Sequence, residues 1–174
     1  MGEGTGDQAA PEHRQQGFSN STLGLLLVAV LLSRLAMWMH SDLWYDEVVT
    51  LVDFVMGGPE GRLSHVFRHY PIANNHVLFS AFAWVWVRLT GFSLLEPILR
   101  LPSVLFSALA VLAVFKLWQR SLGHREALFA ALTLAASPAL SPFYYQFRGY
   151  ALTFLLAVPA TAGAWEMVQG RVRQ

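Results

Sequence analysis

Five long apolar segments run through this sequence, and they limit its possible folds more than any other feature. A helix needs about 20 predominantly apolar residues to cross a bilayer, and several of the segments approach that length. Charged residues make up only 13% of the chain, against about 25% in soluble domains. The sequence therefore predicts an all-α, polytopic membrane helix bundle. The five segments are 22–39, 77–92, 101–118, 127–145 and 150–168.

The N-terminal 20 residues differ in composition from the rest. Residues 1–20 are rich in Gly, Gln and Glu, so they cannot bury enough surface to become ordered. We expect a disordered cytoplasmic tail, followed by a membrane domain over 21–174. The first apolar segment lacks the short basic flank and the A-x-A cleavage pattern of a signal peptide, which predicts a retained anchor.

The second apolar segment, 77–92, is the least typical of a membrane span. It is short and holds two Trp residues and Arg88, which are residue types that favour the membrane interface. If it lies on the outer surface, six basic residues are cytoplasmic and five are outside, whereas if it crosses, four are cytoplasmic and seven are outside. The positive-inside rule therefore favours the surface arrangement. The outer loop 40–100 and the turn at Arg148 then share one side of the membrane, and the spans are 22–39, 101–118, 127–145 and 150–168.

The outer loop begins with an acidic pair in an apolar setting. Asp46 and Glu47 open the stretch "DEVVTLVDFVMGG", whose spacing predicts a juxtamembrane amphipathic helix over 46–56. A second juxtamembrane helix is expected over 77–92. Carboxylates in the first turn of a helix are stabilised by the helix dipole, so capping alone would explain the pair. The other interpretation is a catalytic carboxylate, and the local pattern alone favours the cap.

Two further polar groups lie next to apolar segments. Asn75 and His76 precede the second segment. They suit either a helix cap with an interfacial His or a polar patch that faces the acids, and the local pattern alone favours the cap. Arg148 lies in a very short turn beside Tyr150, so it must stay near the bilayer surface. An ionisable group at that depth is a candidate for function, although a snorkelling Arg in an aromatic belt has the same pattern.

The composition excludes several kinds of function. Since the chain has no Cys, it has no disulfide framework, no thiolate nucleophile and no cysteine zinc site. Its net charge of +1 gives no information about nucleic acid, but the chain has no basic block, so no nucleic-acid partner is expected. The sequence identifies no cofactor and leaves open whether a divalent metal is needed.

Four motifs in a fixed order resemble the N-terminal part of the GT-C membrane glycosyltransferases, and in particular the family-39-like branch. That branch includes the protein O-mannosyltransferases, the aminoarabinose transferase of lipid A and the RgtA-like enzymes. The motifs are "WYDEVVTL" after the first span, "NNHVLFSAFAWVWVRLTG", "EPILRLPSVLFSALAVL" and "SPFYYQFRGYALTFLL". The resemblance runs from about residue 25 to residue 157.

The chain departs from the family pattern at two places. Many relatives have His-Pro-Pro where this chain has His76, Val77 and Leu78. Mannosyl- and aminoarabinosyltransferases carry a second Asp shortly after a conserved Tyr, whereas residues 151–154 here include no acid. In this respect the chain is similar to the RgtA-like branch. The family's greater length predicts that this chain is the N-terminal portion of a larger enzyme.

The resemblance implies transfer of a sugar, with inversion, from a polyprenyl-phosphate donor to a hydroxyl of a lipid, glycan or protein acceptor. It also implies a multi-pass protein of the bacterial inner (cell) membrane that acts at the outer face. In this scheme Asp46 is the general base that removes the acceptor proton, while Glu47 assists, binds a metal or only caps the helix. The departing phosphate needs positive charge or hydrogen-bond donors. The expected substrate-binding residues are Arg148, His76, Asn75, Arg68 and Tyr150.

Two other functions stay open at this point: a non-enzymatic membrane subunit, and a lipid-binding or transport protein. A subunit needs no water-filled cleft around Asp46. A lipid carrier would share a basic, aromatic groove but would need no base. The sequence identifies neither the sugar nor the acceptor.

Overall fold

The computed structural model describes residues 19–36, 38–56, 61–68 and 76–170. Within these residues the chain is all helical and has no strand, which confirms the predicted fold class, an all-α membrane helix bundle. Almost all of the predicted tail and the candidate Asn75 lie outside the described residues. The elements are α1 (Asn20–Leu35), α2 (Tyr45–Val49), the π-helix η1 (Thr50–Val55), α3 (Leu63–Arg68), α4 (Val77–Leu89), α5 (Glu96–Trp118), α6 (His124–Ala136), α7 (Ser141–Tyr145) and α8 (Tyr150–Val168).

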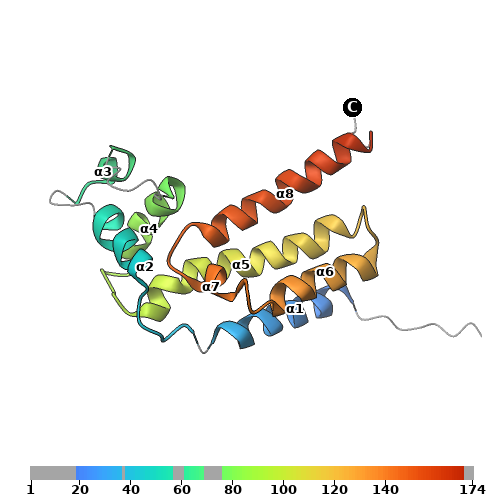
Figure 1. The fold of residues 1–174 in the computed structure, drawn as a ribbon, viewed down its shortest axis with the longest axis horizontal. Coiled ribbons are helices and arrows are strands. Elements are labelled where there is room, and N and C mark those ends of the chain that lie inside the picture. Colours follow the sequence, from blue (N-terminus) through green and yellow to red (C-terminus); the bar gives the residue numbers. More distant parts are fainter. Residues whose placement is uncertain (1–18, 37, 57–60, 69–75, 171–174) are drawn as a thin grey trace, which may run out of the picture.

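Four long helices, α1, α5, α6 and α8, form a bundle (Figure 1). α5 is its central helix and packs against the other three. The buried face of α6 consists of Ala127, Ala131 and Ala135. Because these residues are small and lie four positions apart, the α6 backbone can approach its neighbours closely. Gly24 has a similar role on α1, where an added Cβ would lie 3.3 Å from the Leu112 side chain.

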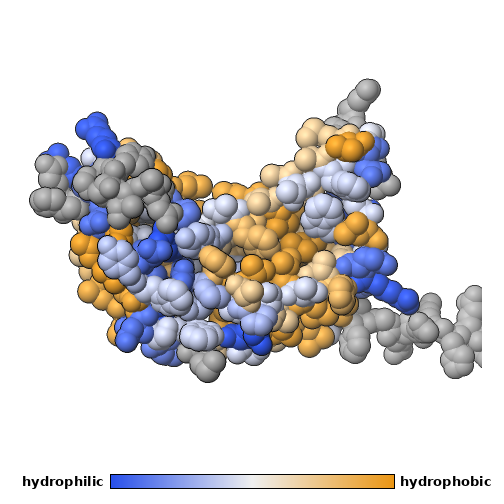
Figure 2. Space-filling model, in the orientation of Figure 1, coloured by the Kyte–Doolittle hydropathy of each residue, from blue (hydrophilic) through white to orange (hydrophobic). Residues whose placement is uncertain are grey.

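The lengths and surfaces of the helices suit a membrane. Among the described residues, α5 and α8 are long and apolar enough to span a bilayer, and α1 and α4 are shorter apolar helices. Large apolar side chains such as Leu25, Leu105 and Phe129 are exposed, and hydrocarbon would cover them without cost. Figure 2 shows hydrophilic side chains gathered over the α2–α4 end and at the opposite end of the bundle, near the α5–α6 connection.

A second group of helices lies at the end of the bundle where α1 ends and α5 begins (Figure 1). The π-helix η1 is its centre and packs against α2, α3 and α4. This group has its own apolar core, which also includes the turn that leads into α8. That core consists of Leu51, Val55, Phe79, Ala83, Val87, Leu99 and Phe147.

The α4 helix is tied to α5 by an unusual hydrogen bond. Pro102 lies inside α5 and has no N–H, so it leaves the carbonyl of Ile98 without its helical donor. The indole Nε1 of Trp86, on α4, donates to that carbonyl at 2.9 Å. The principal packing partners of α4 are η1 and α3, as expected of a surface helix, although its position in a membrane stays a prediction.

The segment 127–145, predicted as one span, is divided in the structure. α6 ends at Ala136, and α7 begins only at Ser141. Pro138 has no N–H for the carbonyl of Leu134. This carbonyl accepts instead from the backbone N–H of Ser137 at 3.2 Å and from the Tyr144 hydroxyl at 3.0 Å. The break folds α7 back against α5.

Other predicted boundaries shift by a few residues. The helix predicted over 46–56 is an α-helical turn that continues as the π-helix η1. α4 ends at Leu89 rather than at residue 92, because Gly91 and Phe92 have positive φ angles of 65° and 59°. α1 ends at Leu35 and α5 begins at Glu96, so the connection between them begins and ends four to five residues earlier than expected and keeps nearly the same length.

Candidate active site

The candidate site forms where the start of α2 meets the turn between α7 and α8. The acidic pair lies in the first turn of α2, as the sequence predicts. The facing turn, residues 146–149, is buried and lies about one hundred residues further along the chain. The contact places the outer loop and this turn at the same end of the bundle, which the surface arrangement of segment 77–92 requires.

Glu47 is completely buried and accepts hydrogen bonds from four nitrogen atoms. The Arg100 guanidinium donates twice, with Nε 3.0 Å from Oε1 and Nη2 2.7 Å from Oε2. The backbone N–H of Trp44 donates to Oε2 at 2.9 Å, which caps α2. The backbone N–H of Phe147 donates to Oε1 at 2.6 Å. The carboxylate therefore joins three separate segments of the chain.

Arg100, the partner of Glu47, was not among the predicted site residues. Its side chain is also fully buried. Besides Glu47, it donates to the backbone carbonyls of Trp38 at 2.8 Å, Ser41 at 2.7 Å and Asp42 at 3.0 Å. One signal in the sequence could have found it, since an Arg that directly precedes the apolar run of α5 needs an acidic partner near the membrane surface.

Asp46 points to a different part of the structure from Glu47 and pairs with Arg148. The distance from Arg148 Nη1 to Asp46 Oδ2 is 2.7 Å, and the side chains are 3% and 52% exposed, respectively. The guanidinium carbon of Arg148 also lies 5.4 Å from the centre of the Tyr150 ring. A buried cation is thus held against a carboxylate that water or a second substrate can reach.

His76 stands beside this pair at the start of α4. Its ring meets the Tyr150 ring edge to face, with 4.9 Å between the ring centres. The ring lies so close to Gly149 that an added Cβ would come within 2.5 Å of His76 Cβ and 2.6 Å of Cγ. Burial, and after it the charge of Arg148, lower the pKa of His76 below its usual 6.5. This lowering of the pKa favours the neutral imidazole at pH 7.

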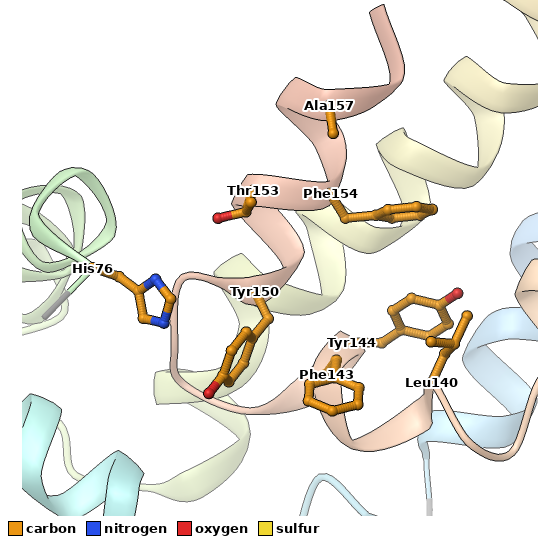
Figure 3. A pocket seen from close by; sticks show the side chains of 8 residues that line it. All are labelled: His76, Leu140, Phe143, Tyr144, Tyr150, Thr153, Phe154 and Ala157. Atoms are coloured by element: carbon orange, nitrogen blue, oxygen red, sulfur yellow. The ribbon is translucent and has the colours of Figure 1, made fainter. Parts of the chain in front are cut away.

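A mostly apolar cavity of about 330 Å³ adjoins His76 and Tyr150 (Figure 3). In Figure 3 the His76 ring reaches from the start of α4 toward Tyr150, and the remaining side chains come from α7, from α8 and from Leu140, which directly precedes α7. A smaller cavity of about 160 Å³ also contacts His76 and Thr153. The lining of the larger cavity is His76, Leu140, Phe143, Tyr144, Tyr150, Thr153, Phe154 and Ala157.

The structure brings together four of the predicted site residues: Asp46, Arg148, His76 and Tyr150. Arg68 ends α3 with an exposed side chain, and no contact within the described part of the chain joins it to the other four. The described part of the chain contains no group of three or more His, Asp or Glu side chains that could hold a metal ion. The oxygens of Glu47, the predicted alternative metal ligand, are already occupied by N–H donors.

Comparison with known proteins identifies the family. Residues 75–169, more than half of the chain, match the family described as dolichyl-phosphate-mannose-protein mannosyltransferase. The matched region includes His76, Arg100, Arg148 and Tyr150, and begins after the acidic pair. Neither the curated proteins nor the solved structures include a significant match. The chain belongs to the dolichyl-phosphate-mannose-protein mannosyltransferase family, and it is therefore a membrane protein of mannosyltransferase-like glycosyltransferase type.

Proposed function

We propose that this protein transfers a sugar from a polyprenyl-phosphate donor to an acceptor hydroxyl at the outer face of the bacterial inner membrane, with Asp46 as the general base. The family match supports glycosyl transfer, and the family description names a lipid-phosphate mannose donor and a protein acceptor. The observation that carries the proposal is the ion pair between Asp46 and Arg148 at 2.7 Å. The pair stands beside two residues that line an apolar cavity, His76 and Tyr150.

The proposed reaction is a direct displacement. The acceptor oxygen attacks the anomeric carbon of the sugar while the bond from that carbon to the phosphate oxygen breaks. The hydroxyl proton passes to the Asp46 carboxylate. The electron pair of the broken bond leaves with the lipid phosphate, so the phosphate needs a cation in place. Attack from the side opposite the phosphate inverts the anomeric centre.

Arg148 is suited to contact the phosphate, and Asp46 is suited to contact the acceptor. The guanidinium is buried, so its charge is little screened and acts strongly on a bound anion. Without a donor, Arg148 and Asp46 neutralise each other. A donor phosphate that engages the guanidinium would compete with Asp46 and leave its carboxylate available. Because the Asp46 side chain is about half exposed, an acceptor can approach it from the aqueous side.

The apolar cavity is suited to the first units of the prenyl chain. Its aromatic and aliphatic lining comes from α7, α8 and the residue directly before α7, Leu140. Since α8 is largely exposed along its length, the rest of the lipid could follow that helix into the bilayer. His76 and Tyr150 supply polar atoms where the chain would meet the phosphate. Asn75 and Arg68 stay predictions as substrate ligands. We assign no chemical step to Glu47, since its oxygens already accept four hydrogen bonds.

Replacement of the proposed base tests this function. Asp46→Asn should lower turnover about 10²–10⁴-fold, which is the usual contribution of a general base, while donor binding is retained because Arg148 is intact. The measurement is transfer from radiolabelled polyprenyl-phosphate sugars by the detergent-purified protein, with donor binding assayed separately. Asp53→Asn is the matched control, since Asp53 lies on the adjoining η1 and has no ion pair among the described residues.

Three outcomes would contradict the proposal. Normal turnover by Asp46→Asn would show that the acid is not the base. Donor binding by the unaltered protein without transfer to lipid, glycan or peptide acceptors would favour the lipid-binding alternative. A protein that neither binds the donor nor transfers a sugar would fit the non-enzymatic subunit.

A further inference from the structure

The Glu47 carboxylate holds the backbone next to both proposed reactive groups. Glu47 directly follows Asp46 in the first turn of α2. The N–H group that donates to Glu47 Oε1 belongs to Phe147, the residue directly before Arg148, at 2.6 Å. One buried carboxylate therefore connects the backbone beside the proposed base to the backbone beside the proposed cation, and it does so independently of the ion pair itself.

Arg100 fixes the position of that carboxylate. Its guanidinium meets both oxygens of Glu47, at 3.0 Å and 2.7 Å. Its remaining N–H groups donate to carbonyls of the α1–α2 connection, at Trp38, Ser41 and Asp42. A planar group with five donors can satisfy all these acceptors at once, whereas a Lys ammonium has three donors and no fixed fork. Arg100 thus links Glu47 to the α1–α2 connection.

The arrangement matters most when the ion pair opens. In the proposed reaction the donor phosphate takes Arg148 away from Asp46, so the attraction between the two side chains no longer sets their separation. The hydrogen bonds of Glu47 do not involve either group and remain in place. Catalysis is sensitive to such separations, since a misplacement of about 1 Å can cost about 10²-fold in rate.

We propose that Glu47 and Arg100 are positioning residues, which keep Asp46 and Arg148 at a fixed separation while the donor is bound. This inference rests on the proposed function. It assigns the second acid of the pair to geometry rather than to proton transfer or metal binding. The alternative is a buried ion pair that contributes only to folding, which would affect the stability of the protein and not the distance between α2 and α8.

A distance measurement tests the inference without any need for activity. The chain has no native Cys, so spin labels can be placed at Val48→Cys on α2 and Ala160→Cys on α8, both of which are exposed. In the Asp46→Asn background, where the ion pair is absent, we expect one narrow distance distribution. Adding Arg100→Lys or Glu47→Gln should broaden or shift it. Arg88→Lys is the matched control, because Arg88 also binds backbone carbonyls, at Val55 and Gly61, but lies on α4 away from the pair.

Kinetics give the second measurement. With Asp46 present, Arg100→Lys should lower kcat about 10–100-fold, while the donor dissociation constant changes less than about threefold. Glu47→Gln keeps the shape of the side chain and an acceptor for one of the two backbone donors, Trp44 and Phe147, and removes the charge that pairs with Arg100, so it tests the same point if Arg100→Lys folds poorly. Unchanged distances and kcat in a variant with a lowered melting temperature would overturn the inference. An inactive unaltered protein would instead contradict the proposed function and would leave the distance test valid.

Discussion

Asp46 and Glu47 are adjacent in the chain, and their carboxylates stand in opposite surroundings. Successive residues on a helix point about 100° apart, since a turn has 3.6 residues. One acid of the pair therefore turns inward to Arg100, and the other turns to the half-exposed site with Arg148. The sequence predicts that the pair begins a helix and that it either caps the helix or acts in catalysis. It does not show which acid is buried, because this depends on where two distant Arg residues come to lie.

Gly149 gives a test at the scale of one residue. Its φ angle of −71° suits any residue, so the need for Gly comes only from the His76 ring, which occupies the space of a side chain. Gly149→Ala should therefore displace His76 and cost about 1–3 kcal/mol, as overpacking of a close contact does. If His76 contacts the donor, donor affinity should fall as well. Thermal unfolding and donor binding in detergent measure the two effects.

Gly163→Ala is the matched control for this prediction. Gly163 lies within the same helix, α8, and an added Cβ meets nothing within 4 Å. Because Ala favours a helix over Gly by about 0.5–1 kcal/mol, this change should leave stability equal or slightly higher. Equal behaviour of the two variants would show that the close approach of His76 to Gly149 has no energetic weight.

At the scale of elements, the hydropathy pattern predicts regular helices better than it predicts the breaks within them. The last apolar segment and α8 have the same bounds, 150–168, because Gly149 directly precedes the segment and Gln169 and Gly170 directly follow it. Segment 127–145 was predicted as one span, although it contains Pro138. Hydropathy gives little weight to a missing N–H, whereas the structure divides the segment there and satisfies the Leu134 carbonyl with the Tyr144 hydroxyl. The π-helix η1 likewise has no signal in an amphipathic pattern.

The bond between Trp86 and Ile98 gives a test at this scale. Trp86→Phe removes the donor to a carbonyl that Pro102 leaves without its helical partner, so it should cost about 1–3 kcal/mol, the penalty of an unsatisfied buried group. In a Pro102→Ala background, the restored N–H can donate to Ile98, and the same change at Trp86 should cost clearly less. Thermal unfolding of the two single variants and the double variant measures this difference. Equal costs in both backgrounds would show that the indole contributes packing only.

At the scale of the whole molecule, the candidate site with Asp46 and Arg148 lies between two apolar cores. One core lies within the bundle of α1, α5, α6 and α8, and the other lies within the group around η1. The site residues come from the surfaces where the two meet. The sequence predicts Asp46, Arg148, His76 and Tyr150 as candidates, since polar and ionisable residues beside apolar membrane segments are often functional. It misses Arg100, because the partner of a buried charge is a matter of tertiary packing rather than of local pattern.

The final prediction concerns how the molecule sits in a membrane. If α4 lies on the outer surface, both of its ends face outward, together with α3. The end of the bundle opposite the site, at the α5–α6 connection, then faces inward. Single Cys residues report this, because the native chain has none. Exposed positions suit the purpose: Ser64 on α3, Leu94 after α4, and Leu122 in the α5–α6 connection.

We expect an impermeant thiol reagent added to intact cells to label Ser64→Cys and Leu94→Cys, and to label Leu122→Cys only after the membrane is made permeable. The reason is the ion pair of Asp46 with Arg148, which can form only if the outer loop and the turn before α8 lie on one side. Labelling of Ser64→Cys and Leu94→Cys from opposite sides would mean that α4 crosses the bilayer. The acid and the cation would then be separated by the hydrocarbon core, about 30 Å thick, and the proposed site could not exist.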